Sequence, residues 1–140
     1  MPGSRLSNED FKALAELRLQ IRRYLHFSEQ AARRAGLEPQ QQQMLLALKG
    51  LPAGRQPAIG EMARRLQLRH HSAVELADRM AARRLVKRAR SADDARVVLL
   101  KITPKGERLL HDLSLVHREE LRGRGPGLLK ALRALLAPKG

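Results

Sequence analysis

The chain has 140 residues, 43% of them hydrophobic, which is enough for the core of one domain with or without dimerisation arms. Its 28 Lys and Arg against 14 Asp and Glu give a net charge of +14, which favours a polyanionic partner, either a nucleic acid or an anionic membrane surface. Cysteine is absent, which excludes disulfides and sensing through a reactive thiol. No signal peptide and no apolar run of about 18 residues is present, so we expect a cytoplasmic protein with no membrane span.

The N-terminal part predicts two helices. The first runs from Asn8 to about Ala35, with Ser7 as its N-cap, acidic residues in its first turn and Gly36 as its stop. Its inner stripe consists of Phe11, Leu14, Leu17, Ile21, Tyr24, Leu25 and Ser28. A second helix begins at Pro39 and ends at Gly50, with Met44, Leu45 and Leu48 facing inward. The first helix is long for a small domain, and a partner chain is one way to cover it.

The middle of the chain predicts a helix, a tight turn and a second helix. Apolar residues at helical spacing place the first helix over Ile59 to about Leu66, and the turn covers about Gln67 to His70. The second helix runs from about His71 to Arg84. Its inner stripe consists of Ala73, Leu76, Ala77 and Met80, and its outer face carries His71, Val74, Glu75 and Arg79. Such a pair fits a helix-turn-helix, whose second helix can enter a DNA major groove.

A hairpin with a basic strand follows. The alternating "VKRAR", the turn-rich "SADDAR" and the β-branched "VVLLKI" predict two strands joined by a charged tip. A hairpin after a helix-turn-helix is a wing, and its tip can place an arginine in a minor groove. From Arg55 to Lys105 there are 13 Lys and Arg against 5 Asp and Glu, a net charge of +8.

The C-terminal part predicts two further helices. Thr103 is the N-cap and Pro104 the first residue of a helix to about Arg122. The "GRGPG" segment then breaks the chain, and a short helix spans Leu128 to Leu136. The apolar stripe of that last helix is too hydrophobic to face water, which predicts that it is buried.

The central motifs resemble the winged helix-turn-helix of the MarR family of transcriptional regulators. The matching segments are "EMARRL", "HHSAVELADRMAARRLVKR", the wing motif Asp94-Ala95-Arg96 with Arg96 seven residues before Thr103, and "ITPKG". One departure is Glu75, where relatives often have a basic or small residue, and this concerns the base preference.

The resemblance implies a mostly α fold with a small β-hairpin wing, in which the N- and C-terminal helices form a dimerisation arm. Residues 1–140 would form a single domain, with the winged helix-turn-helix lobe at about 37–103 and dimerisation helices at about 7–36 and 104–140. It further implies an obligate homodimer that binds double-stranded DNA at a pseudo-palindromic operator and acts as a repressor.

The residue types suggest how DNA would be bound. Arg69 and Ser72 flank a helix start that suits a phosphate, although Ser72 is nearly as well explained as an N-cap or first-turn residue. His70 and His71 could contact a phosphate or a base edge, or form a solvated pair. Val74 fits a thymine methyl group.

Several charged residues have two interpretations. Glu75 could accept from a cytosine amine or form an ion pair with Arg79. Arg88 and Arg90 are expected to meet phosphates, and Asp78 to pair with a nearby arginine. Arg96, oriented by Asp94, could enter a minor groove or form an ordinary ion pair at the hairpin tip.

Other activities are less well supported. The chain has no nucleophile elbow, phosphate-binding glycine loop or HExxH motif, so we expect no enzyme and no cofactor. We expect no metal either, because His111 and His117 are six residues apart and do not share a helix face.

The family resemblance also implies a possible small aromatic ligand, with Tyr24, His26, Phe27 and Met44 as candidate contacts, although Tyr24 and Phe27 are more simply core residues. The alternatives to an operator-specific regulator are a nucleoid-type protein that recognises only charge and a small-molecule-binding protein on the same fold.

Overall fold

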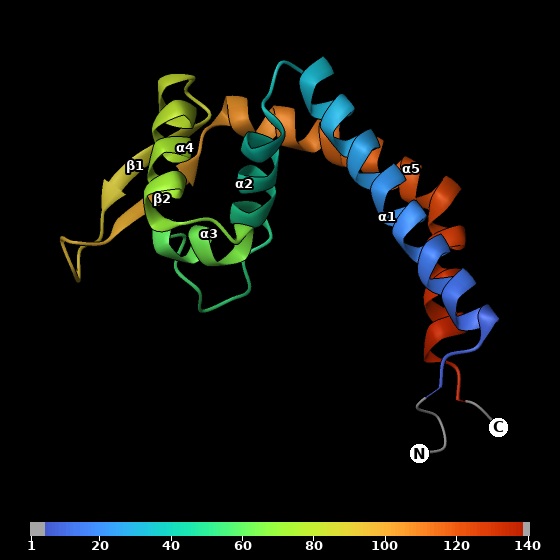
Figure 1. Cartoon of the computed structure of the whole chain (residues 1–140). Helices are drawn as coiled ribbons and strands as arrows, with labels where there is room; N and C mark the ends of the chain where they lie inside the picture. Colours follow the sequence, from blue (N-terminus) through green and yellow to red (C-terminus); the bar gives the residue numbers. More distant parts are fainter. Residues whose placement is uncertain (1–4, 139–140) are drawn as a thin grey trace. The chain divides into compact units, whose positions relative to one another are not determined.

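A computed structural model describes residues 5–138 of the chain. Over this range the protein forms five helices and one antiparallel pair of strands (Figure 1). In chain order these are α1 (Asn8–Arg34), α2 (Pro39–Lys49), α3 (Ile59–Leu66), α4 (His70–Ala82), β1 (Val86–Arg90), β2 (Val98–Ile102) and α5 (Pro104–Leu136). The predicted fold class, mostly helical with a β-hairpin wing, is confirmed. No helix within the described range is long and apolar enough to cross a membrane.

The chain divides into two compact units. The central unit comprises residues 32–113 and holds α2, α3, α4 and the hairpin. The terminal unit comprises the described residues up to 31 and from 114 onward, which are most of α1 and the larger part of α5. The predicted boundaries of the DNA-binding lobe and the dimerisation helices stay a prediction.

The central unit is built around a core of aliphatic side chains and methionines. The stripe predicted for α4 is buried, with Ala73, Ala77 and Met80 fully inaccessible and Leu76 at 1% exposure. Opposite it lie buried residues of the neighbouring elements, among them Met44 and Leu45 of α2 and Met62 of α3. Burial of these side chains fixes α4 with its other face outward, because apolar surface is removed from water only on the stripe side.

The wing forms in the predicted place. Val86 pairs with Ile102 and Arg90 with Val98 in an antiparallel register. Only Val86 of β1 is buried, and the remaining four residues of that strand are exposed. The tip between the strands is closed by the Ser91 amide, which donates to the Val97 carbonyl at 2.9 Å.

Local signals set both ends of α1. The Asp10 amide donates to the Ser7 hydroxyl at 3.2 Å, and the Ser7 amide donates to the Asp10 carboxylate at 2.8 Å. At the other end Gly36 has a φ of 80°, and the Leu37 amide donates to the Ala32 carbonyl at 2.9 Å. This left-handed glycine ends the helix as predicted.

The junction between the wing and α5 is tightly packed. Thr103 caps α5 as predicted, because its hydroxyl accepts from the Gly106 amide at 3.1 Å. The same hydroxyl donates to the Arg84 carbonyl at 2.5 Å and lies 3.1 Å from the Leu85 carbonyl oxygen. A side chain at Gly106 would clash with the Leu85 carbonyl oxygen, so only glycine allows the start of α5 to approach this closely.

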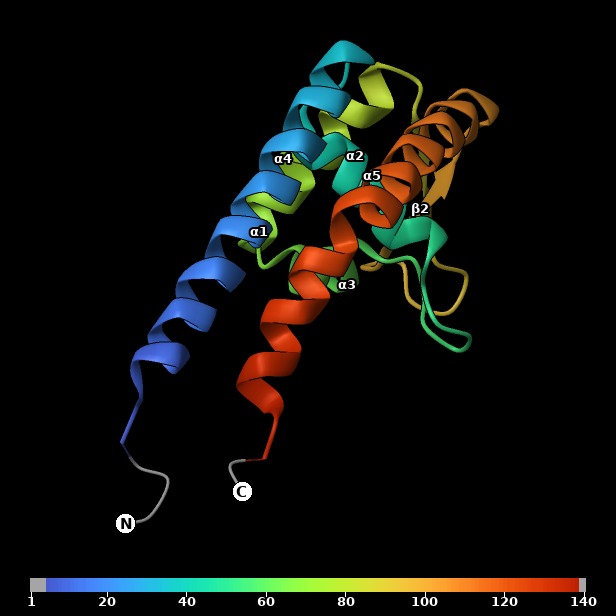
Figure 2. The ribbon, with the colours of Figure 1, turned by 90° about the vertical axis from the view of Figure 1, so that its right-hand side faces the viewer.

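The predicted break in the C-terminal helix is wrong. Residues 104–136 form one continuous helix, with Pro126 inside it. In the terminal unit, α1 and α5 run side by side in opposite directions (Figures 1 and 2). Leu121 and Leu128, on either side of the "GRGPG" segment, line one cleft with Tyr24 of α1. The continuous helix keeps these two leucines on one face, two turns apart, which offsets the hydrogen bond lost at the proline.

Gly127 has a packing role in the same segment. A Cβ atom added there would lie 3.0 Å from the side-chain nitrogen of Gln20 on α1. The glycine therefore leaves room for the end of the Gln20 side chain against α5, where the sequence suggested a break.

Candidate nucleic-acid interface

The outer face of α4 is polar and accessible. Arg69, His70, His71 and Glu75 are exposed, and Ser72 and Val74 are half-buried. The helix begins at His70, one residue earlier than predicted, which places Ser72 in the first turn. Arg69 occupies the N-cap position in an extended conformation and makes no capping hydrogen bond with its side chain. The positive end of the helix dipole is therefore open for an anion.

Glu75 is not paired with Arg79. Arg79 instead contacts the Glu38 carboxylate, with nitrogen–oxygen distances of 3.1 and 3.2 Å. Glu38 precedes α2 and forms two hydrogen bonds with the buried Gln41. The Glu38 backbone amide donates to the Gln41 side-chain oxygen at 3.1 Å, and the Gln41 side-chain nitrogen donates to the Glu38 carboxylate at 2.9 Å. Within the described range Glu75 has no ion-pair partner, so its carboxylate is available to a ligand at the middle of α4.

The wing tip presents one arginine almost completely to solvent. The Asp94 carboxylate accepts from the Arg96 backbone amide at 3.0 Å and from the guanidinium at 3.1 and 3.2 Å. These hydrogen bonds from Arg96 lower the pKa of Asp94 below its usual range. The Arg96 side chain is nevertheless 91% exposed. The structure thus contains the predicted ion pair and holds the guanidinium outward at the hairpin tip.

The two arginines of β1 have different environments. Arg88 forms an ion pair with Asp78 of α4, which confirms the prediction that Asp78 pairs with a nearby arginine. This pair links the wing to α4. Arg90 donates to the carbonyl oxygen of Ala95 at 2.7 Å and so braces the wing tip. Both guanidinium groups remain on an exposed strand.

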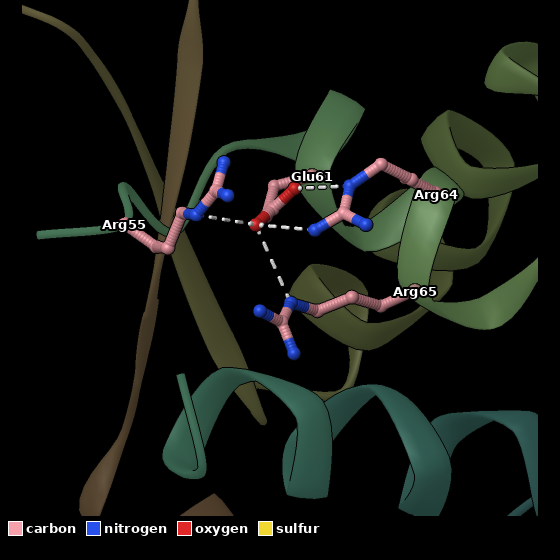
Figure 3. Close-up of polar contacts among 4 residues, drawn as sticks. All are labelled: Arg55, Glu61, Arg64 and Arg65. Atoms are coloured by element: carbon pink, nitrogen blue, oxygen red, sulfur yellow. Dashed lines mark hydrogen bonds and ion pairs between the residues drawn. The ribbon is translucent and has the colours of Figure 1, made fainter. Parts of the chain in front are cut away.

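A cluster of three arginines around Glu61 is absent from the sequence-based predictions (Figure 3). The Glu61 carboxylate contacts the Nε atoms of Arg64 at 2.9 Å, Arg65 at 3.4 Å and Arg55 at 3.9 Å. Hydrogen bonds and charge from Arg64, followed by those from Arg65, lower the pKa of Glu61 to about 2. The spacing of Glu61 to the two arginines, three and four residues, is a signal that could have identified the α3 part of this cluster.

The four candidate ligand contacts do not share one environment. In the terminal unit, Tyr24 and Phe27 have edge-on contacts with the imidazole of His117, with ring centroids 6.0 and 5.7 Å apart. The His117 Nε2 atom lies 2.7 Å from the Ser28 hydroxyl, and burial raises the pKa of Tyr24. His26 is exposed, and Met44 is fully buried in the core of the central unit. Tyr24 and Phe27 are half-buried, so both the small-ligand site and the simpler interpretation of these two residues as core stay predictions.

A short helix, a tight turn, a second helix with an exposed polar face and a hairpin define a winged helix-turn-helix protein. Residues 35–97 match the model of the MarR family. This match covers most of the winged helix-turn-helix part of the chain and confirms the resemblance seen in its motifs.

A curated relative is similar to a part of the chain of about the same length. The chain is 34% identical over 64 residues to an uncharacterized HTH-type transcriptional regulator, YsmB, of Bacillus subtilis (strain 168). That match covers 46% of this chain and 44% of the relative, so it spans less than half the length of each.

Solved structures share the fold over more of the chain. AbsC, a MarR family transcriptional regulator from Streptomyces coelicolor, is 19% identical, with a TM-score of 0.75 over 96% of this chain and 93% of that one. BldR, a transcriptional regulator from Sulfolobus solfataricus, is 23% identical, with a TM-score of 0.65 over 94% and 99%. A mutant of MepR from S. aureus bound to an oligodeoxyribonucleotide is 18% identical, with a TM-score of 0.63 over 76% of each chain.

Proposed function

We propose that this protein is a homodimeric, sequence-specific DNA-binding regulator that represses transcription in the cytoplasm. The observation that carries the proposal is the central unit itself, whose exposed α4 face and exposed wing-tip Arg96 belong to one winged helix-turn-helix. The S. aureus MepR structures bound to DNA support the same use of this fold.

In this proposal α4 enters the major groove and the wing enters the minor groove. The open N-terminus of α4, with Arg69, His70 and Ser72, would bind a backbone phosphate. Further along the helix, Val74 would contact a thymine methyl group and the unpaired Glu75 would accept from a cytosine amine. Together these contacts would supply the base preference.

Arg96 would lie in the minor groove, where a narrow, electronegative groove attracts a guanidinium. Arg88 and Arg90 would contact phosphates along the wing, and Arg79 would do so from α4. Such phosphate contacts position the protein on the duplex but carry no sequence information directly.

The terminal unit would supply the dimer. Its two helices expose large apolar side chains that a second copy could cover, including Phe11, Leu25, Leu129 and Leu132 at 40–57% exposure. Two copies would place two recognition helices about 34–36 Å apart on a pseudo-palindromic site. A small aromatic effector that changed this spacing would release the DNA.

The experiment that tests the proposal is fluorescence anisotropy against DNA upstream of the protein's own gene and against a shuffled duplex, at several salt concentrations. An operator-specific regulator should prefer the upstream duplex by about a thousandfold or more near physiological salt. Equal affinities that fall together with salt would instead support the nucleoid-type alternative, which recognises charge alone. A chain that binds neither duplex would favour the small-molecule-binding alternative.

Replacing Arg96 with Ala tests the wing directly. We expect the variant to lose roughly 1–3 kcal/mol of binding free energy for the operator, because the exposed guanidinium is removed. This is the usual size for a side chain that contacts base edges in a groove. Dimerisation should not change, because Arg96 lies at the hairpin tip of the central unit. Anisotropy measures the first effect and analytical ultracentrifugation the second. Unchanged operator affinity would show that the wing does not contact DNA.

A further inference from the structure

We infer that Arg55, Arg64 and Arg65 form a binding site for a phosphate of the DNA backbone, which Glu61 organises and moderates. The inference rests on the proposed function, and it adds a contact that comes from α3 and the loop before it. In this site three guanidinium groups surround one carboxylate (Figure 3).

The carboxylate contacts the inner edges of the guanidinium groups. Arg55 and Arg65 approach Glu61 through Nε, and Arg64 through Nε at 2.9 Å and Nη2 at 3.1 Å. Within residues 5–138 no protein group accepts from the terminal nitrogens of Arg55 and Arg65. These nitrogens are the donors that bind phosphate oxygens with matching geometry.

Charge and exposure also favour an anion. Three guanidinium groups surround a single carboxylate, which leaves the cluster with a net charge of +2. The side chains of Arg55 and Arg64 are both 61% exposed, whereas that of Glu61 is only 12% exposed. An approaching polyanion therefore meets the arginines before it meets the carboxylate. Because Arg55 and Arg64 are largely exposed, solvent screens their pairs with Glu61, and a phosphate can compete for the donors.

The chain path brings the cluster beside the two elements proposed to contact DNA. Arg64 and Arg65 lie in the last turn of α3, and a tight turn through Gln67, with a φ of 54°, leads directly to the start of α4. Arg55 lies in the loop whose Pro57 carbonyl accepts from the Leu100 amide of β2 at 2.8 Å. In helix-turn-helix proteins the first helix crosses the DNA backbone while the second occupies the groove. The cluster is then placed to contact that backbone.

Glu61 has two effects on the proposed phosphate site. It holds three long side chains in one place, which reduces the entropy lost when a phosphate binds. It also removes one unit of positive charge from the site, which limits attraction to any duplex irrespective of sequence.

A matched pair of arginine variants tests the site. Arg64→Gln removes a guanidinium paired with a glutamate three residues earlier, and Arg122→Gln does the same in α5, where Arg122 pairs with Glu119 at 3.2 Å. For a shuffled duplex, we expect Arg64→Gln to make the log–log salt slope shallower by about 0.9, whereas Arg122→Gln leaves it unchanged. This corresponds to a loss of affinity between about 50 and 200 mM salt that is roughly 3.5-fold smaller than in the wild type.

Glu61→Gln, compared with Glu119→Gln, tests the moderating role. Removal of the Glu61 charge should raise affinity for the shuffled duplex and steepen its salt slope by up to about 0.9, more than the Glu119 variant does. Equal slopes for Arg64→Gln and Arg122→Gln, in a wild-type protein that binds duplex normally, would overturn the phosphate site and leave the proposed function standing. A wild-type protein that binds no duplex would overturn both.

Discussion

The two units of the chain use hydrophobic residues in opposite ways. In the central unit, large side chains such as Leu45, Met62 and Met80 are completely inaccessible to solvent. In the terminal unit, the described large hydrophobic residues include many that are at least 39% exposed: Leu6, Phe11, Leu14, Leu19, Ile21, Leu25, Leu115, Val116, Leu121, Leu129, Leu132 and Leu136. The central unit therefore contains its own core, whereas two helices side by side cannot cover so much apolar surface. The difference separates a part that can fold around itself from a part whose stability would come from a partner.

The largest effect should come from placing charge on the terminal unit. We predict that Leu132→Glu combined with Leu135→Glu yields monomers or unfolded chains, because carboxylates would replace apolar groups on the surface that we assign to the dimer. Analytical ultracentrifugation reports the mass of the assembly, and circular dichroism reports folding. Leu46→Glu is the control, because Leu46 is 50% exposed in the central unit and should tolerate the charge. A stable dimer of the double variant would place the dimer interface elsewhere.

A smaller effect is expected from truncation in the core of the central unit. Leu45→Ala should lower the free energy of unfolding by roughly 2–5 kcal/mol, because the fully buried side chain leaves a cavity. Its neighbour Leu46 lies on the same helix with half of its surface exposed, so Leu46→Ala should cost less than about 0.5 kcal/mol. Chemical unfolding of both variants measures the difference. Equal costs would contradict the burial pattern on which the comparison of the units depends.

The central unit could be predicted from sequence far better than the terminal unit. Ala73, Leu76, Ala77 and Met80 recur at helical spacing, and this spacing alone identifies them as the buried face of α4. Thr103 and Gly36 carried local signals that the structure confirms. The segment around Pro126 and Gly127 carried an equally clear local signal, but packing against α1 overrode it. Local patterns thus succeed where the core is local and fail where a distant helix supplies the contacts.

The candidate site shows the same limit. Glu75 and Arg79 are correctly spaced for a helical ion pair, and the sequence could not show that Glu38, 41 residues before Arg79, would take the arginine instead. The pairing of Asp78 with an arginine could be predicted, but the choice of Arg88 depends on how the hairpin folds back on α4. Residues that face outward could be identified from periodicity, whereas their partners depend on tertiary contacts.

The smallest predicted effect is a difference between the two units in how their stability depends on pH. The lowered pKa values of Glu61, to about 2 from 4.5, and of Asp94 belong to the central unit, and the raised pKa of Tyr24 belongs to the terminal unit. Below about pH 4.5 these two carboxylates become protonated in the unfolded chain but stay ionised in the folded protein. The stability that the pairs contribute is therefore complete above that pH and is lost as the pH falls toward 2. Above pH 10 the unfolded tyrosine ionises first, so rising pH destabilises the folded terminal unit.

Tyr24 is the only tyrosine and the chain has no tryptophan, so intrinsic fluorescence reports on the terminal unit while circular dichroism reports on the whole chain. In urea unfolding between about pH 5 and pH 3, we expect acid to shift the midpoint measured by circular dichroism more than the fluorescence midpoint. The shift should be small because the arginine partners Arg64 and Arg96 are largely exposed to solvent, which screens the pairs, and a Glu61→Gln, Asp94→Asn variant should reduce it. Identical shifts by both probes would mean that the units unfold as one cooperative structure, and the terminal helices would then share the stability of the central core.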